Sequence, residues 1–139
     1  MSRSGYVDDM EDQLSFGRWR AQVKSAIRGK RGQEFLRELA DAMDAMPEKV
    51  LIAEELINDD GDCCAIGVVC KARGIDVSTI DHEVPEQVGA AVGIARQMAA
   101  EIEYENDDWL TETPEKRWVR MRKWVDSQIV SEAPAGTAF

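Results

Sequence analysis

Apolar residues recur every three or four positions along most of the chain, which is the spacing of one face of an α-helix. The first such segment begins near Asp9, and a second runs from about Gln33 to Met46 before Pro47. Between them, the glycines of Gly29–Gly32 interrupt the pattern. We therefore expect two helices that pack as a helical hairpin. The apolar positions that define them are Leu14, Phe16, Trp19, Val23, Ala26, Ile27, Phe35, Leu36, Leu39, Met43 and Met46.

Residues 50–64 do not keep this spacing. Val50–Ile57 is largely aliphatic, and the polar run Asn58–Asp62 is a strong turn signal. We expect a small β-hairpin here, whose second arm leads into a helix over Ala65–Arg73 that ends at Gly74. A helix over residues 50–57 is the alternative.

Proline and glycine mark the boundaries of helices in the second half of the chain. Pro85 suits the first turn of a short helix that stops at Gly93, and Ala95–Glu105 forms the next amphipathic segment. The clearest helix start is Thr113-Pro-Glu115, because threonine caps, proline fits the first helical position and glutamate favours the positive end of the dipole. That helix is predicted to reach about Val130.

These patterns predict a mainly α protein of five to six helices, with at most one small β-hairpin near residues 50–64. We expect residues 9–130 to form a single compact domain, with a flexible N-terminus at residues 1–8 and a disordered tail at residues 131–139. A chain of 139 residues is long enough for one hydrophobic core. The residues expected in that core are Trp19, Leu36, Leu39, Ile66, Val69, Ile102, Trp118 and Val125.

Composition favours a cytoplasmic protein. Charged residues interrupt every apolar run, so no membrane-spanning segment is expected, and residues 1–13 lack the apolar stretch of a signal peptide. The three cysteines, Cys63, Cys64 and Cys70, are clustered and odd in number, which is unlike a secreted disulfide framework. We expect reduced thiols.

Charge is unevenly distributed along the chain. The net charge is -10, which argues against a general DNA-coating protein. One interpretation is that basic and acidic faces complement each other within the fold, and another is that an acidic surface meets a basic partner. A third is that the basic segment grips phosphate or nucleic acid. That basic segment contains Arg18, Arg20, Lys24, Arg28, Lys30 and Arg31.

The residues with metal-binding or catalytic chemistry do not form a recognised motif. Adjacent Cys63 and Cys64, with Cys70 and the single His82, do not have the paired spacing of a zinc site. The turn at Asp59–Asp62 lacks the alternating ligands of a calcium loop. We therefore expect no metal and no cofactor. Cys64 at a helix start is a candidate nucleophile, since a helix dipole favours the thiolate.

The order of several short motifs resembles a family of small hypothetical proteins from bacteriophage and prophage genomes. A looser similarity to other uncharacterised phage and actinobacterial domains rests on Cys64-Ala-Ile-Gly67, Asn106-Asp107 and Thr113-Pro-Glu115. The looser similarity implies that the corner at Cys64 packs near the turn at Asn106. The motifs of the first resemblance are Ser2-Arg-Ser-Gly-Tyr6, Trp19-Arg20, Ile27-Arg-Gly-Lys-Arg-Gly-Gln33, Met46-Pro-Glu-Lys49, Leu51-Ile-Ala-Glu-Glu-Leu56, Cys64-Ala-Ile-Gly67, Ala72-Arg-Gly-Ile-Asp76, Glu105-Asn-Asp107, Thr113-Pro-Glu115, Arg117-Trp118 and Trp124-Val125.

From the charge and the resemblance we expect a non-enzymatic, acidic protein-binding module, phage-encoded and acting in the host cytoplasm. It would bind, and inhibit, a host protein such as a defence or nucleic-acid-binding factor. One alternative is an enzyme or enzyme accessory using Cys64, Asn106 and Asp107, and another is nucleic-acid binding through Arg18–Arg31. The acidic residues expected to bind the partner protein are Asp59, Asp60, Asp62, Glu101, Glu105, Asp107, Asp108 and Glu112.

Overall fold

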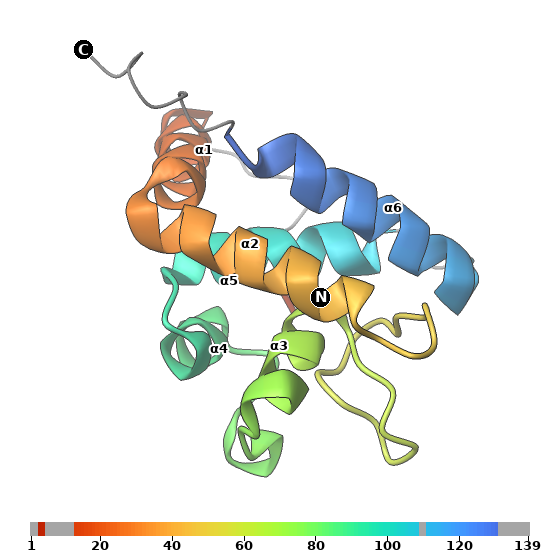
Figure 1. Ribbon diagram of the computed structural model, residues 1–139. Helices are drawn as coiled ribbons and strands as arrows, with labels where there is room; N and C mark the ends of the chain where they lie inside the picture. Colours follow the sequence, from red (N-terminus) through yellow and green to blue (C-terminus); the bar gives the residue numbers. More distant parts are fainter. Residues whose placement is uncertain (1–2, 5–12, 109–110, 131–139) are drawn as a thin grey trace.

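Helices account for most of the chain in the computed structural model, which describes residues 3–4, 13–108 and 111–130 (Figure 1). The mainly α fold with six helices confirms the predicted class. The elements in order are α1 (Gln13–Arg28), α2 (Lys30–Asp44), α3 (Ala65–Arg73), the 3-10 helix η1 (Val77–Thr79), α4 (Pro85–Val92), α5 (Arg96–Asp107) and α6 (Pro114–Gln128).

The second helix begins at Lys30, three residues earlier than the sequence indicated, so Gly32 lies inside its first turn. A Cβ atom at Gly32 would lie 2.0 Å from the Ala26 carbonyl oxygen. Gly32 is therefore required for the close approach of α1 and α2, and Gly29 alone serves as the residue that precedes α2.

The expected hairpin is reduced to one antiparallel bridge between Ile57 and Cys63, and the described residues contain no strand. The turn forms as expected, because the Asn58 side-chain oxygen accepts hydrogen bonds from the backbone of Asp60 and Asp62. The first arm fails to extend because Glu54 adopts a φ of 71°, which bends the backbone. The alternative of a helix over residues 50–57 is also wrong, since these residues are not helical.

The core lies between α2, α5 and the helices on either side of them. α2 contacts α1, α3 and α6, while α5 contacts α1, α3, α4 and α6 (Figure 1). Of the eight residues expected to be buried, Trp19 and Trp118 are only partly buried against the core. Phe16, placed on the inner face of α1 by its spacing, is exposed. The six confirmed buried residues are Leu36, Leu39, Ile66, Val69, Ile102 and Val125.

Arginine–carboxylate pairs join helices at the surface of this core. Arg122 of α6 donates to both carboxylate oxygens of Asp44 at the end of α2, at 2.8 and 3.0 Å. Arg73 of α3 donates from two nitrogens to Glu38 of α2, and its hydrogen bonds lower the pKa of that carboxyl. Basic and acidic faces thus complement each other within the fold at these positions.

The ends of the chain are described in part. Arg3 and Ser4 belong to the segment expected to be flexible, and both are buried. The expected helical residues 9–12 and the expected disordered tail at 131–139 lie outside the described residues. Among the helices that the structure describes, none combines the length and apolar character needed to cross a membrane.

Candidate functional site

Asn106, near the C-terminal end of α5, ties three segments together. Its side-chain oxygen accepts a hydrogen bond of 3.0 Å from the backbone N–H of Ala65, the first residue of α3. Its amide nitrogen donates to the Ile52 carbonyl oxygen at 2.8 Å. This contact confirms that the corner at Cys64 packs near the turn at Asn106. Asn106 is fully buried and serves as a structural tie for the loop that precedes α3.

Cys64 precedes the same helix start and is enclosed there. Its sulfur accepts a hydrogen bond from the Gly67 backbone at 3.4 Å, and 1% of the residue is exposed. A Cβ atom at Gly67 would lie 1.9 Å from the Leu56 carbonyl oxygen, so the loop packs directly on the backbone of α3. The sulfur of Cys64 therefore caps a helix in a closed environment.

The structure brings Asp107 to the same corner. Asp107 accepts hydrogen bonds from the Glu54 backbone at 3.0 Å and from the Asn106 side chain at 2.8 Å. It also accepts two from the Arg3 guanidinium, at 2.6 and 3.0 Å. The three candidate catalytic residues Cys64, Asn106 and Asp107 are thus neighbours, and each is hydrogen-bonded to the fold.

Arginines of α6 hold the opposite side of this corner. Arg117 donates to the Asn106 carbonyl oxygen at 2.9 Å, and Arg120 donates to the Glu105 carbonyl oxygen at 2.6 Å. Both arginines pair with Glu112, Arg120 through two hydrogen bonds of 2.9 Å. The last carbonyls of α5 therefore receive cationic donors, which also suit the negative end of its dipole.

Much of the predicted acidic face is used inside the molecule. Glu101 is buried and pairs with Arg20 of α1 at 2.6 Å, just as Asp107 pairs with Arg3 and Glu112 with the arginines of α6. Glu105 is half-buried, and burial raises the pKa of its carboxyl. Asp108 is exposed. The segment from 101 to 112 therefore contributes few free carboxylates to the surface.

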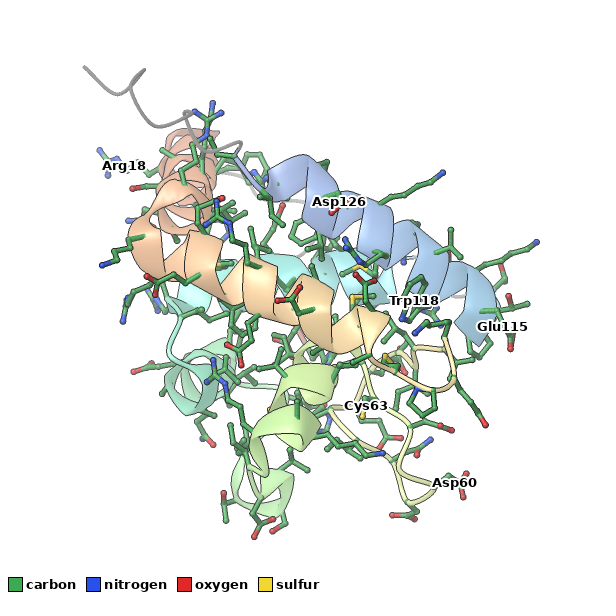
Figure 2. All side chains as sticks on the ribbon, viewed as in Figure 1. Arg18, Asp60, Cys63, Glu115, Trp118 and Asp126 are labelled. Atoms are coloured by element: carbon green, nitrogen blue, oxygen red, sulfur yellow. The ribbon has the colours of Figure 1, made fainter. Side chains whose placement is uncertain are left out.

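The acidic turn at residues 59–62 has a different setting. Asp59 and Asp60 are exposed, and Asp60 lies at the tip of the loop between α2 and α3 (Figure 2). Asp60 and Asp62 line a hollow of about 500 Å³, which we call the acidic hollow. Lys71 spans its edge and donates to the Gly61 carbonyl oxygen at 3.0 Å. The other residues lining the acidic hollow are Ala42, Ala45, Met46, Pro47, Glu48, Val50, Cys63, Val68 and Ala72.

The hydrogen bonds at the C-terminal end of α5 do not join its acidic residues to the acidic turn at residues 59–62. Asn106 and Asp107 bind the backbone at Ile52 and Glu54, which precede the acidic turn in the same loop. The turn itself packs toward Lys71 of α3. Of the predicted partner-binding acids, the acidic hollow collects Asp60 and Asp62, with Asp59 beside them in the turn.

The basic segment lies at the corner between α1 and α2. Arg18, Lys24, Arg28 and Arg31 are exposed, and the described residues give them no ion-pair partner. Lys30 lies 4.0 Å from Glu34. A hollow of about 250 Å³ at this corner is lined by the first residues of both α2 and α5, and neither start has a side-chain cap.

The thiols have no metal-binding arrangement. Burial raises the pKa of both Cys63 and Cys70 to about 11. Within residues 3–4, 13–108 and 111–130, no three histidine, cysteine or acidic side chains are placed to hold one ion. His82 lies in the loop before α4, outside the cysteine cluster.

Sequence reasoning missed the partner of Asp107. Arg3 was assigned to a flexible end, yet its side chain is 3% exposed and lies between Asp107 and Glu103. Glu103 is fully buried on α5. One signal was present in the sequence, because Glu103 follows Ile102 and lies one turn after Ala99, on the face that the apolar spacing assigns to the core.

Comparisons with models of protein families, with curated proteins and with solved structures found no match to this chain.

Proposed function

We propose that the protein is a non-enzymatic binding module, and that the acidic hollow receives a basic segment of a partner protein. The observation that carries this proposal is the pairing of acidic and apolar chemistry in one place. Asp60 and Asp62 line a hollow whose other walls include Ala42, Met46 and Val68. Such a surface attracts a lysine or arginine and buries the apolar residues beside it.

The physical advantage of this arrangement is selectivity. Exposed carboxylates speed the encounter with a positively charged segment, while apolar walls supply area that is removed from water on binding. Lys71 donates to the Gly61 carbonyl oxygen at the edge of the acidic hollow. Asp60 and Asp62 have no ion-pair partner among the described residues, so both carboxylates are available to a basic partner. A net charge of -10 adds a long-range attraction for basic proteins.

The resemblance to phage proteins suggests the class of partner protein. We propose that the partner is a host protein, such as a defence or nucleic-acid-binding factor, and that the module inhibits it stoichiometrically by covering a basic site. The small size and acidic charge of the chain support this proposal.

The test is capture of a partner from bacterial lysate by the purified protein, followed by binding measurements with the captured protein. Replacement of Asp60 and Asp62 by lysine should weaken binding by about tenfold or more, because two attractions become repulsions. Higher salt should weaken wild-type binding in the same direction. Glu83→Lys is the matched control, since Glu83 is exposed and does not line the acidic hollow. Equal loss in both variants would contradict the proposal.

A second candidate function is the binding of a polyanion at the basic corner. The specific observation in its favour is that Arg31, which has no ion-pair partner among the described residues, lines the hollow where α2 and α5 begin without side-chain caps. Arg28 is the last residue of α1, close to this hollow in the chain. A gel shift with duplex DNA should then be lost when Arg28 and Arg31 are both replaced by alanine. It should be kept when Lys116 and Lys123 are both replaced by alanine. A shift that survives the first pair of substitutions would rule this corner out.

The enzyme alternative at Cys64, Asn106 and Asp107 has its own test. The closed, hydrogen-bonded setting of Cys64 gives a nucleophile no access to a substrate. A turnover activity that disappears in Cys64→Ala, while the fold is retained, would transfer the proposal to that site.

A further inference from the structure

Two carboxylates lie one turn apart on α5, and they face the same arginine. Glu103 is fully buried, and the side chain of Asp107 is 11% exposed. Arg3 lies against both with its own side chain 3% exposed. The contact is independent of the acidic hollow, which none of these three residues lines.

The guanidinium of Arg3 is held in an orientation that suits its planar shape. Its Nε and Nη2 atoms donate to the two oxygens of Asp107, at 2.6 and 3.0 Å. Its remaining nitrogen, Nη1, lies 3.1 Å from a Glu103 oxygen, without the alignment of a hydrogen bond. The paired geometry on Asp107 is the two-point recognition that distinguishes arginine from lysine.

The two carboxyl groups differ in how well their oxygens are hydrogen-bonded. Asp107 receives further hydrogen bonds from Asn106 and from the Glu54 backbone, so its oxygens are well satisfied. Both oxygens of Glu103, in contrast, lack a hydrogen-bond partner among the described residues although they are buried. A buried carboxyl without hydrogen bonds destabilises a fold, so a second acid at this place is not explained by packing.

We propose that the pocket formed by Glu103, Asp107 and the Glu54 backbone is a guanidinium-binding site, that Arg3 is its intramolecular ligand, and that an arginine side chain or a free guanidinium ion binds there when Arg3 is removed. The ligand class follows from the geometry of the two carboxylates. A lysine ammonium is a single point charge, and it cannot donate in parallel to Asp107 while it also faces Glu103.

The test is chemical rescue of an Arg3→Ala variant. The change should lower the melting temperature, because it removes the cation that donates two hydrogen bonds to the Asp107 carboxylate. Methylguanidinium, the end of an arginine side chain, should restore the melting temperature along a saturable one-site curve at millimolar concentration. Methylammonium at the same ionic strength should not, and wild-type protein should not respond to either ion.

Matched variants separate the pocket from a general salt effect. Adding Asp107→Asn to Arg3→Ala should weaken the rescue by about tenfold or more in apparent affinity, because the carboxylate that receives both guanidinium hydrogen bonds is lost. Adding Asp108→Asn, an exposed neighbour, should leave the rescue unchanged. If Arg3→Ala does not fold in buffer, methylguanidinium and not methylammonium should restore its helical circular dichroism signal.

Two results would overturn the proposal. One is an Arg3→Ala protein as stable as the wild type, which would mean that Arg3 is not the ligand of this pocket. The other is an equal response to methylguanidinium and methylammonium, which would mean that the pocket recognises charge and not the planar fork.

Discussion

At the scale of single residues, the buried polar groups at the end of α5 determine how the loop, the N-terminal arginine and α3 fit together. Asn106 satisfies the first backbone N–H of α3 and the carbonyl of Ile52 with one side chain. Glu103 is the opposite case, since neither of its buried oxygens has a hydrogen-bond partner in the part of the chain that the structure describes. We therefore expect substitution of Asn106 to remove hydrogen bonds that stabilise the fold, and substitution of Glu103 to change how stability depends on pH.

Substitution of Asn106 by alanine should destabilise the protein by about 2–4 kcal/mol, because it leaves a buried N–H and a buried carbonyl without partners. Urea denaturation would measure the change. Asp108→Ala, two residues away and exposed, should stay within about 0.5 kcal/mol of wild type. Equal effects of the two substitutions would show that the amide contacts contribute little.

The carboxyl of Glu103 should make stability fall with rising pH. Burial raises the pKa of Glu103 to about 8, with Asp107 adding to the shift and Arg3 opposing it, from an ordinary value of 4.5. Between these values the folded state holds a proton that the unfolded state has released, so the contribution of Glu103 to stability is fully present below pH 4.5 and is lost as the pH rises to about 8.

The measurement is the free energy of unfolding of wild type and Glu103→Gln from pH 5 to pH 9. The difference between the two curves should change across this window, since glutamine carries no titrating group. Parallel curves would mean that Glu103 ionises at its ordinary pH in the folded protein.

The three thiols should be inert in the folded protein. Cys63, Cys64 and Cys70 are all buried and free, and burial raises the pKa of Cys63 and Cys70 to about 11. A disulfide reagent such as dithionitrobenzoate should therefore react slowly in buffer and rapidly in urea. One rapidly reacting thiol per chain in buffer, or stoichiometric bound zinc, would contradict this expectation.

At the scale of elements, hydrophobic spacing and the residues that begin and end helices predicted the helices well, although α3 buries six consecutive residues and not one face. Pro85–Val92 has the expected bounds, and Thr113 caps α6 by accepting from the Lys116 backbone as its residue type indicated. The loop at residues 50–57 was not predicted, because its course depends on Asn106 and Asp107 of a distant helix. Local spacing contains no information about such contacts.

Part of the candidate site could be predicted from local sequence, and part depends on contacts between distant segments. The acidic turn at Asp60 and Asp62 was visible as a run of acids, but the apolar walls of the acidic hollow come from α2 and α3 and needed the fold. Glu101, Asp107 and Glu112 looked equally exposed in the sequence. The arginine partners of Asp107 and Glu101 lie 104 and 81 residues away along the chain, which no local pattern reveals. The partner of Glu112, Arg120, lies only eight residues away but on the next helix.

Replacement of Leu39 by alanine should cost about 2–5 kcal/mol, because Leu39 is fully buried where α2 meets its neighbours. Val119→Ala on the outer face of α6 should have little effect, since Val119 is 51% exposed. Urea denaturation followed by circular dichroism would measure both. A small loss for Leu39→Ala would mean that the core collapses around the cavity.

At the scale of the whole molecule, charge is separated between two distant regions. Arg18 on α1 and Asp60 on the loop before α3 lie at opposite ends of the view in Figure 2. Ion pairs such as Arg20 with Glu101 and Arg122 with Asp44 neutralise charges elsewhere on the helices. The acidic hollow and the basic corner can therefore be tested separately, since a substitution at one leaves the field at the other nearly unchanged beyond a distance of about 10 Å in ordinary buffer.

The contact of Arg3 with Asp107 joins two residues that are 104 positions apart. Closing so long a loop costs conformational entropy before the contact stabilises anything, so we expect Arg3 to dock after α5 has packed against its neighbours. A contact made after the folding barrier leaves the rate of folding nearly unchanged when it is removed, and its loss appears in the rate of unfolding. Loss of the Arg3 contact should therefore shorten the lifetime of the native state and leave the time needed to form it nearly unchanged.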